Sequence, residues 1–164
     1  MRDLYILRHG EAANGPRGIT DHERALTPMG AESAQKQGLR VSPAAHQKML
    51  VSTALRTQQT AAGLMEAWGG QTAPSLPEVV LELRGYLASA DTWMDLMALT
   101  DDRVQGLWLV GHNPGVSALV TLLTGEYVGM ATADLMHLTL EIDAWSEVRM
   151  SCGQVAAYHP GRGA

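Results

Sequence analysis

Two arginines and two histidines stand just beyond short apolar runs of the sequence: Arg8, His9, Arg56 and His112. Such runs are typical of buried strands. The carboxyl ends of parallel strands meet at one edge of a sheet, and in open α/β sheets ligands bind there. The planar guanidinium of arginine binds two oxygens of a phosphate or sulfate at once. The four residues therefore predict a pocket for an anion of this kind.

Each of the four residues also has a structural explanation. An arginine at the start of a helix, as expected for Arg56, can simply face water, and a histidine such as His112 can satisfy the polar groups of a loop. The anion-binding interpretation is favoured because both places expose unpaired backbone N–H groups at the positive end of a helix dipole. It is also favoured because three separate strand ends would bring the four side chains to one edge.

The elements that must position these residues can be predicted from hydrophobic spacing. Four short apolar runs are typical of strands: residues 4–7, 48–52, 79–81 and 107–110. Four segments carry small or apolar residues at spacings of three and four, as helices do: residues 28–41, 53–68, 90–100 and 114–124. Thr27 and Asn113 each precede a proline, a pattern typical of an N-cap followed by proline at the first helical position.

The last part of the chain has a different pattern. Residues 136–142 alternate between apolar and polar types, as in an antiparallel strand with one covered face, and residues 148–152 are its expected hairpin partner. Strands that alternate with helices predict a mainly parallel sheet covered on both faces. We therefore expect one α/β domain over residues 1–164, a three-layer α/β/α sandwich with a C-terminal antiparallel hairpin.

Composition excludes several classes of protein. The formal net charge of −5 and the lack of a Lys/Arg run argue against nucleic-acid binding. No apolar run approaches the ~20 residues that cross a bilayer, so no membrane association is expected. The N-terminus shows no signal-peptide pattern, and the single cysteine, Cys152, fits a reducing compartment. A cytoplasmic protein is therefore expected.

Three motifs follow one another in order: Leu-Arg-His-Gly-Glu at residues 7–11, Ser-x-x-x-Arg-x-x-x-Thr-Ala at residues 52–61 and Val-Gly-His-Asn-Pro at residues 110–114. With Arg-x-Leu-Thr-x-x-Gly at residues 24–30, they resemble the histidine phosphatase superfamily. The resemblance covers residues 4–125. The short chain and the close spacing of the first two motifs are most similar to the bacterial phosphohistidine phosphatases of SixA type.

The resemblance implies a phosphohistidine intermediate formed without a metal or cofactor. His9 would accept the phosphoryl group, while Arg8 and Arg56 would hold its oxygens. His112 would lie against the same group from the opposite side. An imidazole that attacks phosphorus must be neutral at one nitrogen, and a backbone carbonyl can orient the other.

The residue that would protonate the leaving group is left open. Relatives that act on phosphate monoesters use a carboxylate for this, and Glu82, at the end of the third expected strand, matches that position best. SixA-type members are thought to manage without an acid, because imidazole leaves more readily than an alkoxide. Glu82 could equally be a partner for an arginine or histidine.

Six other polar residues have both a functional and a structural explanation: Asn14, Asp21, His22, Arg24, Ser52 and Thr53. Asn14 lies where relatives contribute phosphate contacts, although a turn also explains it. The next three belong to a loop that either borders the pocket or is simply solvated. The last two could donate to phosphate or cap a helix.

Two substrate classes fit the resemblance: a phosphorylated protein carrying phosphohistidine, or a small phosphate ester with Glu82 as general acid. Residues 85–108 leave room for one helix and little that could close over a small substrate, which favours the protein. We expect the chain to act as a monomer. A non-catalytic phosphate-binding module is a third alternative, disfavoured because all four core residues are present.

Overall fold

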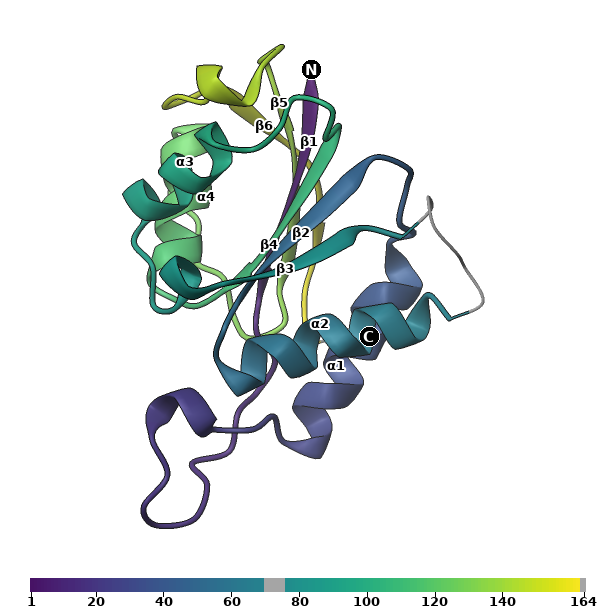
Figure 1. The fold of residues 1–164 in the computed structure, drawn as a ribbon, viewed down its shortest axis with the longest axis vertical. Coiled ribbons are helices and arrows are strands. Elements are labelled where there is room, and N and C mark those ends of the chain that lie inside the picture. The colour runs from purple at the N-terminus through teal and green to yellow at the C-terminus, as the bar shows by residue number, and fades with distance from the viewer. Residues whose placement is uncertain (70–75, 163–164) are drawn as a thin grey trace.

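A six-stranded sheet forms the middle layer of the structure (Figure 1). The computed structural model describes residues 1–69 and 76–162. The strands lie in the order β3-β2-β4-β1-β5-β6. Their bounds are β1 Arg2–Arg8, β2 Gln47–Ser52, β3 Glu78–Glu82, β4 Gly106–Gly111, β5 Leu135–Leu140 and β6 Gly153–His159. The first four strands are parallel to one another, whereas β5 and β6 are antiparallel additions at one side.

Helices cover both faces of this sheet (Figure 1). One face carries the pair α1 Pro28–Arg40 and α2 Leu55–Ala67, and the other carries the pair α3 Ala90–Ala98 and α4 Gly115–Thr124. Three short 3-10 turns complete the order: η1 Asp21–Glu23, η2 Leu83–Gly85 and η3 Trp145–Glu147. The predicted three-layer α/β/α fold is therefore confirmed. No helix in the described ranges is long and apolar enough to cross a membrane.

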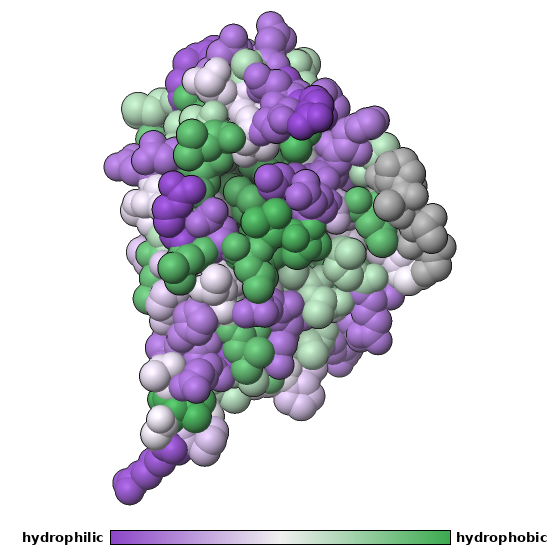
Figure 2. Space-filling view, viewed as in Figure 1, coloured by the Kyte–Doolittle hydropathy of each residue, from purple (hydrophilic) through white to green (hydrophobic). Residues whose placement is uncertain are grey.

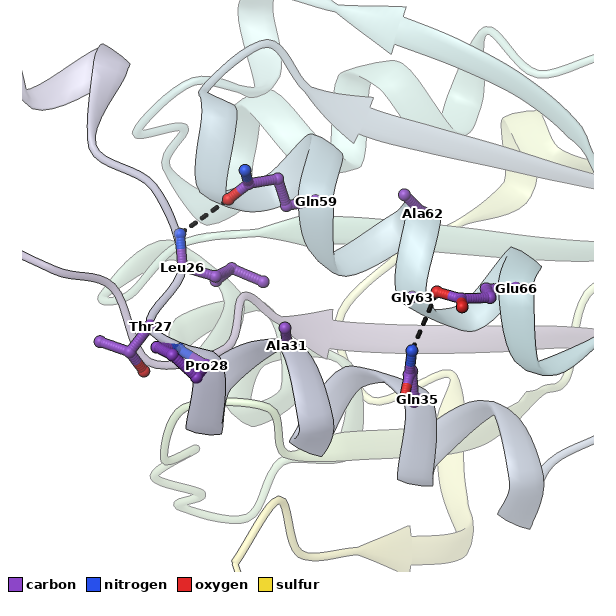
Figure 3. A pocket seen from close by; sticks show the side chains of 9 residues that line it. All are labelled: Leu26, Thr27, Pro28, Ala31, Gln35, Gln59, Ala62, Gly63 and Glu66. Carbon is purple, nitrogen blue, oxygen red and sulfur yellow. Dashed lines mark hydrogen bonds between the residues drawn. The ribbon is translucent and has the colours of Figure 1, made fainter.

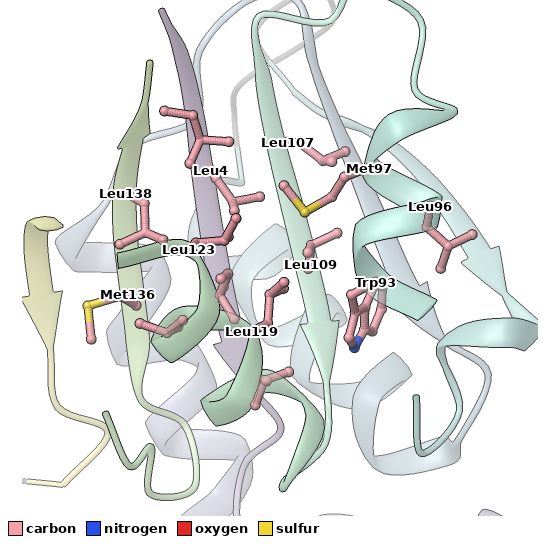
Figure 4. Close-up of a cluster of buried hydrophobic side chains, with 14 of the residues drawn as sticks. Leu4, Trp93, Leu96, Met97, Leu107, Leu109, Leu119, Leu123, Met136 and Leu138 are labelled. Carbon is pink, nitrogen blue, oxygen red and sulfur yellow. The ribbon is translucent and has the colours of Figure 1, made fainter. Parts of the chain in front are cut away.

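The central strands are buried from both sides, which explains their nearly continuous apolar sequences. On β1, Leu4 and Ile6 belong to the cluster beneath α3 and α4, whereas Tyr5 and Leu7 belong to the cluster beneath α1 and α2. Figure 4 shows the first cluster, in which Trp93 of α3 lies beside β4. Burial on both faces fixes the position of β1 and β4, and hence of the residues at their ends.

β3 lies at the edge of the sheet and is covered less completely. Val79 and Leu81 on this strand, and Leu83 just after it, are exposed. Figure 2 shows apolar side chains gathered over the middle of this face, where β3 runs in Figure 1. The edge position explains why an apolar strand has such accessible side chains.

Two helix starts differ in how well they follow the sequence prediction. Thr27 caps α1 as expected, since its hydroxyl accepts a hydrogen bond from Gly30 N at 3.1 Å. Asn113 does not cap α4, which begins at Gly115. Its side chain instead accepts from Ser117 Oγ at 2.6 Å and donates to Met130 O at 2.8 Å. These contacts tie the start of α4 to a neighbouring loop, so the prediction of an N-cap was wrong.

The predicted partner of the C-terminal hairpin was also wrong. The strand that pairs with β5 is β6, and residues 148–152 precede it. The connection is long because η3 folds back onto the core. There Trp145 is fully buried and donates from Nε1 to Val104 O at 2.9 Å. Val148 packs against the same core instead of pairing with β5.

The close packing of α1 on α2 depends on small residues and gives a stability prediction. A Cβ added at Gly38 would lie 2.6 Å from Ala67 Cβ and 3.0 Å from Leu64 O. We expect Gly38→Val to lower the free energy of unfolding by about 1–3 kcal/mol, because overpacking forces the helices apart. Urea titration would measure the change. Met29→Val, at an exposed position of α1, is the control, and an equal loss there would contradict the packing explanation.

Candidate active site

The four side chains predicted to form an anion pocket come together at one edge of the sheet. Arg8 is the last residue of β1 and pairs in register with Gly111, the last residue of β4. His9 and His112 follow directly, and their ring centroids are 5.3 Å apart. Arg56 lies in the first turn of α2, just after β2. Parallel pairing therefore brings residues from distant parts of the sequence to the same place.

His9 is held as a neutral imidazole with one free nitrogen. Its Nδ1 lies 2.6 Å from Gly10 O, and because a carbonyl can only accept, Nδ1 carries the proton. Gly10 is fixed in turn by a hydrogen bond from its N to Thr60 Oγ1. Burial lowers the pKa of His9 to about 4, and the charges of Arg56 and Arg8 act in the same direction. At neutral pH, Nε2 therefore keeps its lone pair.

His112 is also buried and neutral. Its Nε2 lies 2.6 Å from Ser52 Oγ at the end of β2. Its Nδ1 is buried and has no hydrogen-bond partner among the residues described. Burial lowers the pKa of His112 to about 3, with Arg56 and His9 contributing. The contact with Ser52 was not predicted, since the sequence suggested only a phosphate donor or a cap for that residue.

The two arginines are anchored by backbone carbonyls. Arg8 donates from Nη1 to Met130 O at 2.9 Å, and Arg56 donates from Nη1 to Asp21 O at 2.7 Å. Burial lowers the pKa of Arg8. Arg56 is 3 % exposed. Both guanidinium groups are therefore oriented by fixed acceptors before any ligand binds.

Three buried nitrogens in this cluster lack a partner in the part of the chain that the structure describes: Arg8 Nε, Arg56 Nε and His112 Nδ1. An unpaired buried donor costs on the order of 1–3 kcal/mol, so such groups are rare without a reason. In the tautomer in which Ser52 Oγ donates to His112 Nε2, all three nitrogens carry a hydrogen, and an oxyanion in contact with them would supply the missing acceptors. The arrangement is thus suited to a phosphate beside the free Nε2 of His9.

Two further residues belong to this cluster. The sequence left the role of Asp21 open and gave no role to Tyr86. The Tyr86 hydroxyl donates to Asp21 Oδ2 at 2.6 Å, and Arg56 Nη2 donates to the same oxygen at 3.0 Å. The loop around Asp21 therefore borders this cluster of side chains, the alternative that the sequence had left open. A signal for Tyr86 was present, because Gly85-Tyr86 follows the carboxyl end of a fourth parallel strand.

Within the described residues, Glu82 and Asn14 make no hydrogen bond to the four clustered side chains, and their predicted roles stay predictions. The Glu82 carboxylate accepts from Arg84 N at 3.0 Å and from Arg84 Nε at 3.3 Å, so it caps η2. Within the described ranges, no hydrogen bond or ion pair joins Glu82 to the two arginines or two histidines of the pocket. Asn14 is exposed on the loop before η1. Glu82 is thus a partner of an arginine, although not of one in the pocket.

A separate groove of about 370 Å³ lies between α1 and α2 (Figure 3). It is lined by Leu26, Thr27, Pro28, Ala31, Gln35, Gln59, Ala62, Gly63 and Glu66. Hydrogen bonds between Leu26 N and Gln59 and between Gln35 and Glu66 tie its two walls together. None of the four predicted site residues lines it. No cluster of three or more metal-ligating side chains occurs in residues 1–69 and 76–162.

Comparison with known proteins agrees with this geometry. The family described as histidine phosphatase superfamily (branch 1) matches residues 4–81. An uncharacterized protein of Mycobacterium tuberculosis is 31% identical over 169 residues, which cover 95% of this chain and all of that protein. The chain belongs to the histidine phosphatase superfamily. Membership in this superfamily supports phosphatase activity.

Two solved structures of SixA-type proteins are similar to this chain over nearly its whole length. A protein from Agrobacterium tumefaciens assigned as the phosphohistidine phosphatase SixA has a TM-score of 0.78 and 26% identity, covering 96% of this chain and 97% of that one. The protein histidine phosphatase SixA complexed with tungstate has a TM-score of 0.74 and 23% identity, with 97% of each chain covered. The chain is therefore a SixA-like histidine phosphatase superfamily member.

The two buried histidines predict how stability depends on pH. The pKa values of His9 and His112 are lowered to about 4 and about 3, below the ordinary value of about 6.5. Between these values the unfolded chain binds more protons than the folded chain, so acidification favours unfolding. We expect the free energy of unfolding to fall as the pH drops from about 6.5 towards about 4. Urea titrations across this range would measure it, and a flat profile would contradict the assignment.

Proposed function

We propose that this chain hydrolyses phosphohistidine on a phosphorylated protein through a covalent phospho-His9 intermediate, without a metal or cofactor. The observation that carries the proposal is the free Nε2 of His9 beside three buried nitrogens that have no partner within the described residues. The tungstate bound by a SixA protein of the same fold supports it, because tungstate is a tetrahedral oxyanion like phosphate. Arg8, Arg56 and His112 would hold the phosphate oxygens.

In the first step, the lone pair on His9 Nε2 attacks phosphorus, and the P–N bond to the substrate imidazole breaks. If the second ring nitrogen of the substrate is already protonated, that imidazole leaves as a neutral molecule. Phosphoryl transfer depends mainly on positioning and on neutralising the oxygens, which the two arginines and the helix start of α2 would do. No carboxylic acid is required for this step.

In the second step, water attacks the phosphorus of phospho-His9, and the P–Nε2 bond breaks. The Nδ1 proton of His9 stays in its hydrogen bond to Gly10 O throughout, so the phosphorylated ring is the protonated form and a good leaving group. Inorganic phosphate departs, the second proton of water passes to solvent, and His9 returns to its neutral state. The Gly10 carbonyl thus serves both steps.

We also propose that the protein acts as a monomer in the cytoplasm. One chain supplies all four side chains, so residues 1–164 are proposed to act as one domain and as a monomer. Cys152, the single cysteine of the sequence, is a buried free thiol, which fits the reducing conditions of the cytoplasm. The small-ester alternative loses support because the Glu82 carboxylate is bound to Arg84.

Incubation with a phosphorylated histidine-containing phosphotransfer protein tests the proposed function. Wild type should release inorganic phosphate, and His9→Ala should reduce the rate by at least ~10³-fold, because the nucleophile is removed. His159→Ala, a change at a histidine on β6 away from the pocket, is the matched control and should behave as wild type. A His9→Ala protein as active as wild type would refute the mechanism. Tungstate binding without any hydrolysis would indicate a phosphate-binding module.

A second prediction separates the two substrate classes. On the phosphohistidine protein, Glu82→Gln should retain activity within about twofold, since no acid is needed for an imidazole leaving group. Initial rates of phosphate release from this protein and from a small phosphate monoester give the comparison. Substantial monoester turnover in wild type that collapses in Glu82→Gln would favour the small-ester alternative instead.

A further inference from the structure

Tyr86 lies outside every motif that identifies the family, yet it contacts two residues of the candidate site. Its hydroxyl binds Asp21, and its ring lies against His112. We infer that Tyr86 is a positioning residue for phosphoryl transfer: it fixes Asp21, and Asp21 in turn fixes the guanidinium of Arg56. This inference rests on the proposed function, in which Arg56 holds the phosphate. It adds a residue that directly follows η2, beyond the end of β3, to a site otherwise built at the ends of β1, β2 and β4.

The contacts form a continuous chain between two segments that are distant in sequence. The Tyr86 hydroxyl donates to Asp21 Oδ2 at 2.6 Å, and Arg56 Nη2 donates to the same oxygen at 3.0 Å. Arg24 Nη1 donates to Asp21 Oδ1, also at 3.0 Å. These donors hold the pKa of Asp21 well below its ordinary range, so the carboxylate is charged at every pH at which the enzyme would work. The acceptor for Arg56 is therefore constant.

The way in which Asp21 meets Arg56 shows that it orients the guanidinium and does not take the place of phosphate. Its carbonyl and its carboxylate accept from Nη1 and Nη2, the two nitrogens at the far end of the side chain. The Nε–H at the side of the guanidinium is buried and has no partner in the described residues. Arginine can bind an oxyanion through Nε and a second N–H. Asp21 thus holds one edge of the group and leaves the other for phosphate.

Tyr86 is itself held rigidly, as a positioning residue must be. Its ring meets His112 edge-on with centroids 5.5 Å apart and meets His22 edge-on at 4.8 Å. The preceding residue, Gly85, is packed against α3, since a Cβ there would lie 2.9 Å from Trp93 Cη2. The half-buried Tyr86 side chain is therefore placed by its ring contacts and by the packing of Gly85 beside it.

The η1 turn is tied to its surroundings by His22 Nε2, 2.9 Å from Thr53 Oγ1, and by the Thr20–Glu23 cap, but these contacts do not reach the Asp21 carboxylate. The turn is three residues long and contains no buried residue. Apart from Tyr86, the side-chain bonds to the Asp21 carboxylate in the described ranges come from Arg24 and Arg56. Without the Tyr86 hydroxyl, the Asp21 carboxylate would keep only Arg24 and Arg56 as side-chain donors within the described ranges. It would then orient Arg56 less firmly. A loss of orientation then lowers the rate even though the guanidinium is still present.

A double-mutant cycle tests the inference. Tyr86→Phe keeps the ring contacts and removes only the hydroxyl. On the phosphohistidine protein we expect it to lower kcat/KM about 10-fold in the wild-type background. In an Arg56→Lys background the same change should cost less than about twofold, because the oriented fork is already absent. An equal factor in both backgrounds would overturn the inference, as would no effect in either.

Two further measurements test the role of Tyr86 separately from the proposed phosphohistidine hydrolysis. Tyr127→Phe, the same chemical change at an exposed tyrosine, should alter nothing in either background. Tungstate affinity, measured by calorimetry on the four proteins of the cycle, should show the same non-additivity. If wild type does not hydrolyse phosphohistidine, the proposed function fails. The tungstate cycle then still decides whether Tyr86 acts through Arg56, with additive effects refuting it.

Discussion

The parallel pairing of β1, β4 and β2 is the constraint on which the whole site depends. In-register pairing of Arg8 with Gly111 sets His9 and His112 side by side, and the pairing of Val51 with Val110 brings the end of β2 to the same edge. Side chains alternate between faces along a strand, so a shift of one residue would send Arg8 to the other face. Leu4 and Ile6 pack in one cluster and Tyr5 and Leu7 in the other, and such a shift would exchange side chains of different shape between two closely packed clusters. The core therefore fixes the chemistry.

The parallel pairing of β1, β4 and β2 also has an electrostatic consequence. Two guanidinium groups and two imidazoles are forced together in a poorly solvated place, which keeps both imidazoles neutral and leaves three nitrogens without partners in the described part of the chain. Such a cluster is unfavourable by itself, because like charges repel and unpaired donors lose water. A bound phosphate dianion would relieve both costs at once. The clustered positive charges and unpaired nitrogens, which are unfavourable by themselves, would thus favour binding of a phosphate.

Sequence reasoning reached the strands, the helices and the four pocket residues, because each leaves a local pattern: an apolar run followed by a polar residue. It failed where the outcome depends on distant contacts. The strand that pairs with β5 begins later in the sequence than predicted, because Trp145 is buried in the core and hydrogen-bonds to Val104 O. Tyr86 follows the end of a parallel strand, which marks it as a candidate, but its contact with Asp21, 65 positions away, was missed. Hydrogen bonds across such separations have no signature in spacing or composition.

The proposed reaction also needs no carboxylic acid, and Asp21, the carboxylate bound to Arg56, is kept ionised by its donors, which lower its pKa. The substrate linkage and phospho-His9 are the same kind of P–N bond, so the first transfer exchanges one imidazole for another with little change in free energy. Hydrolysis of phospho-His9 then provides the driving force. A phosphate monoester would instead release an alkoxide, which needs a proton from a nearby acid. Glu82 is bound to Arg84 at η2, so the proposed reaction assigns it no proton transfer, as an imidazole leaving group allows.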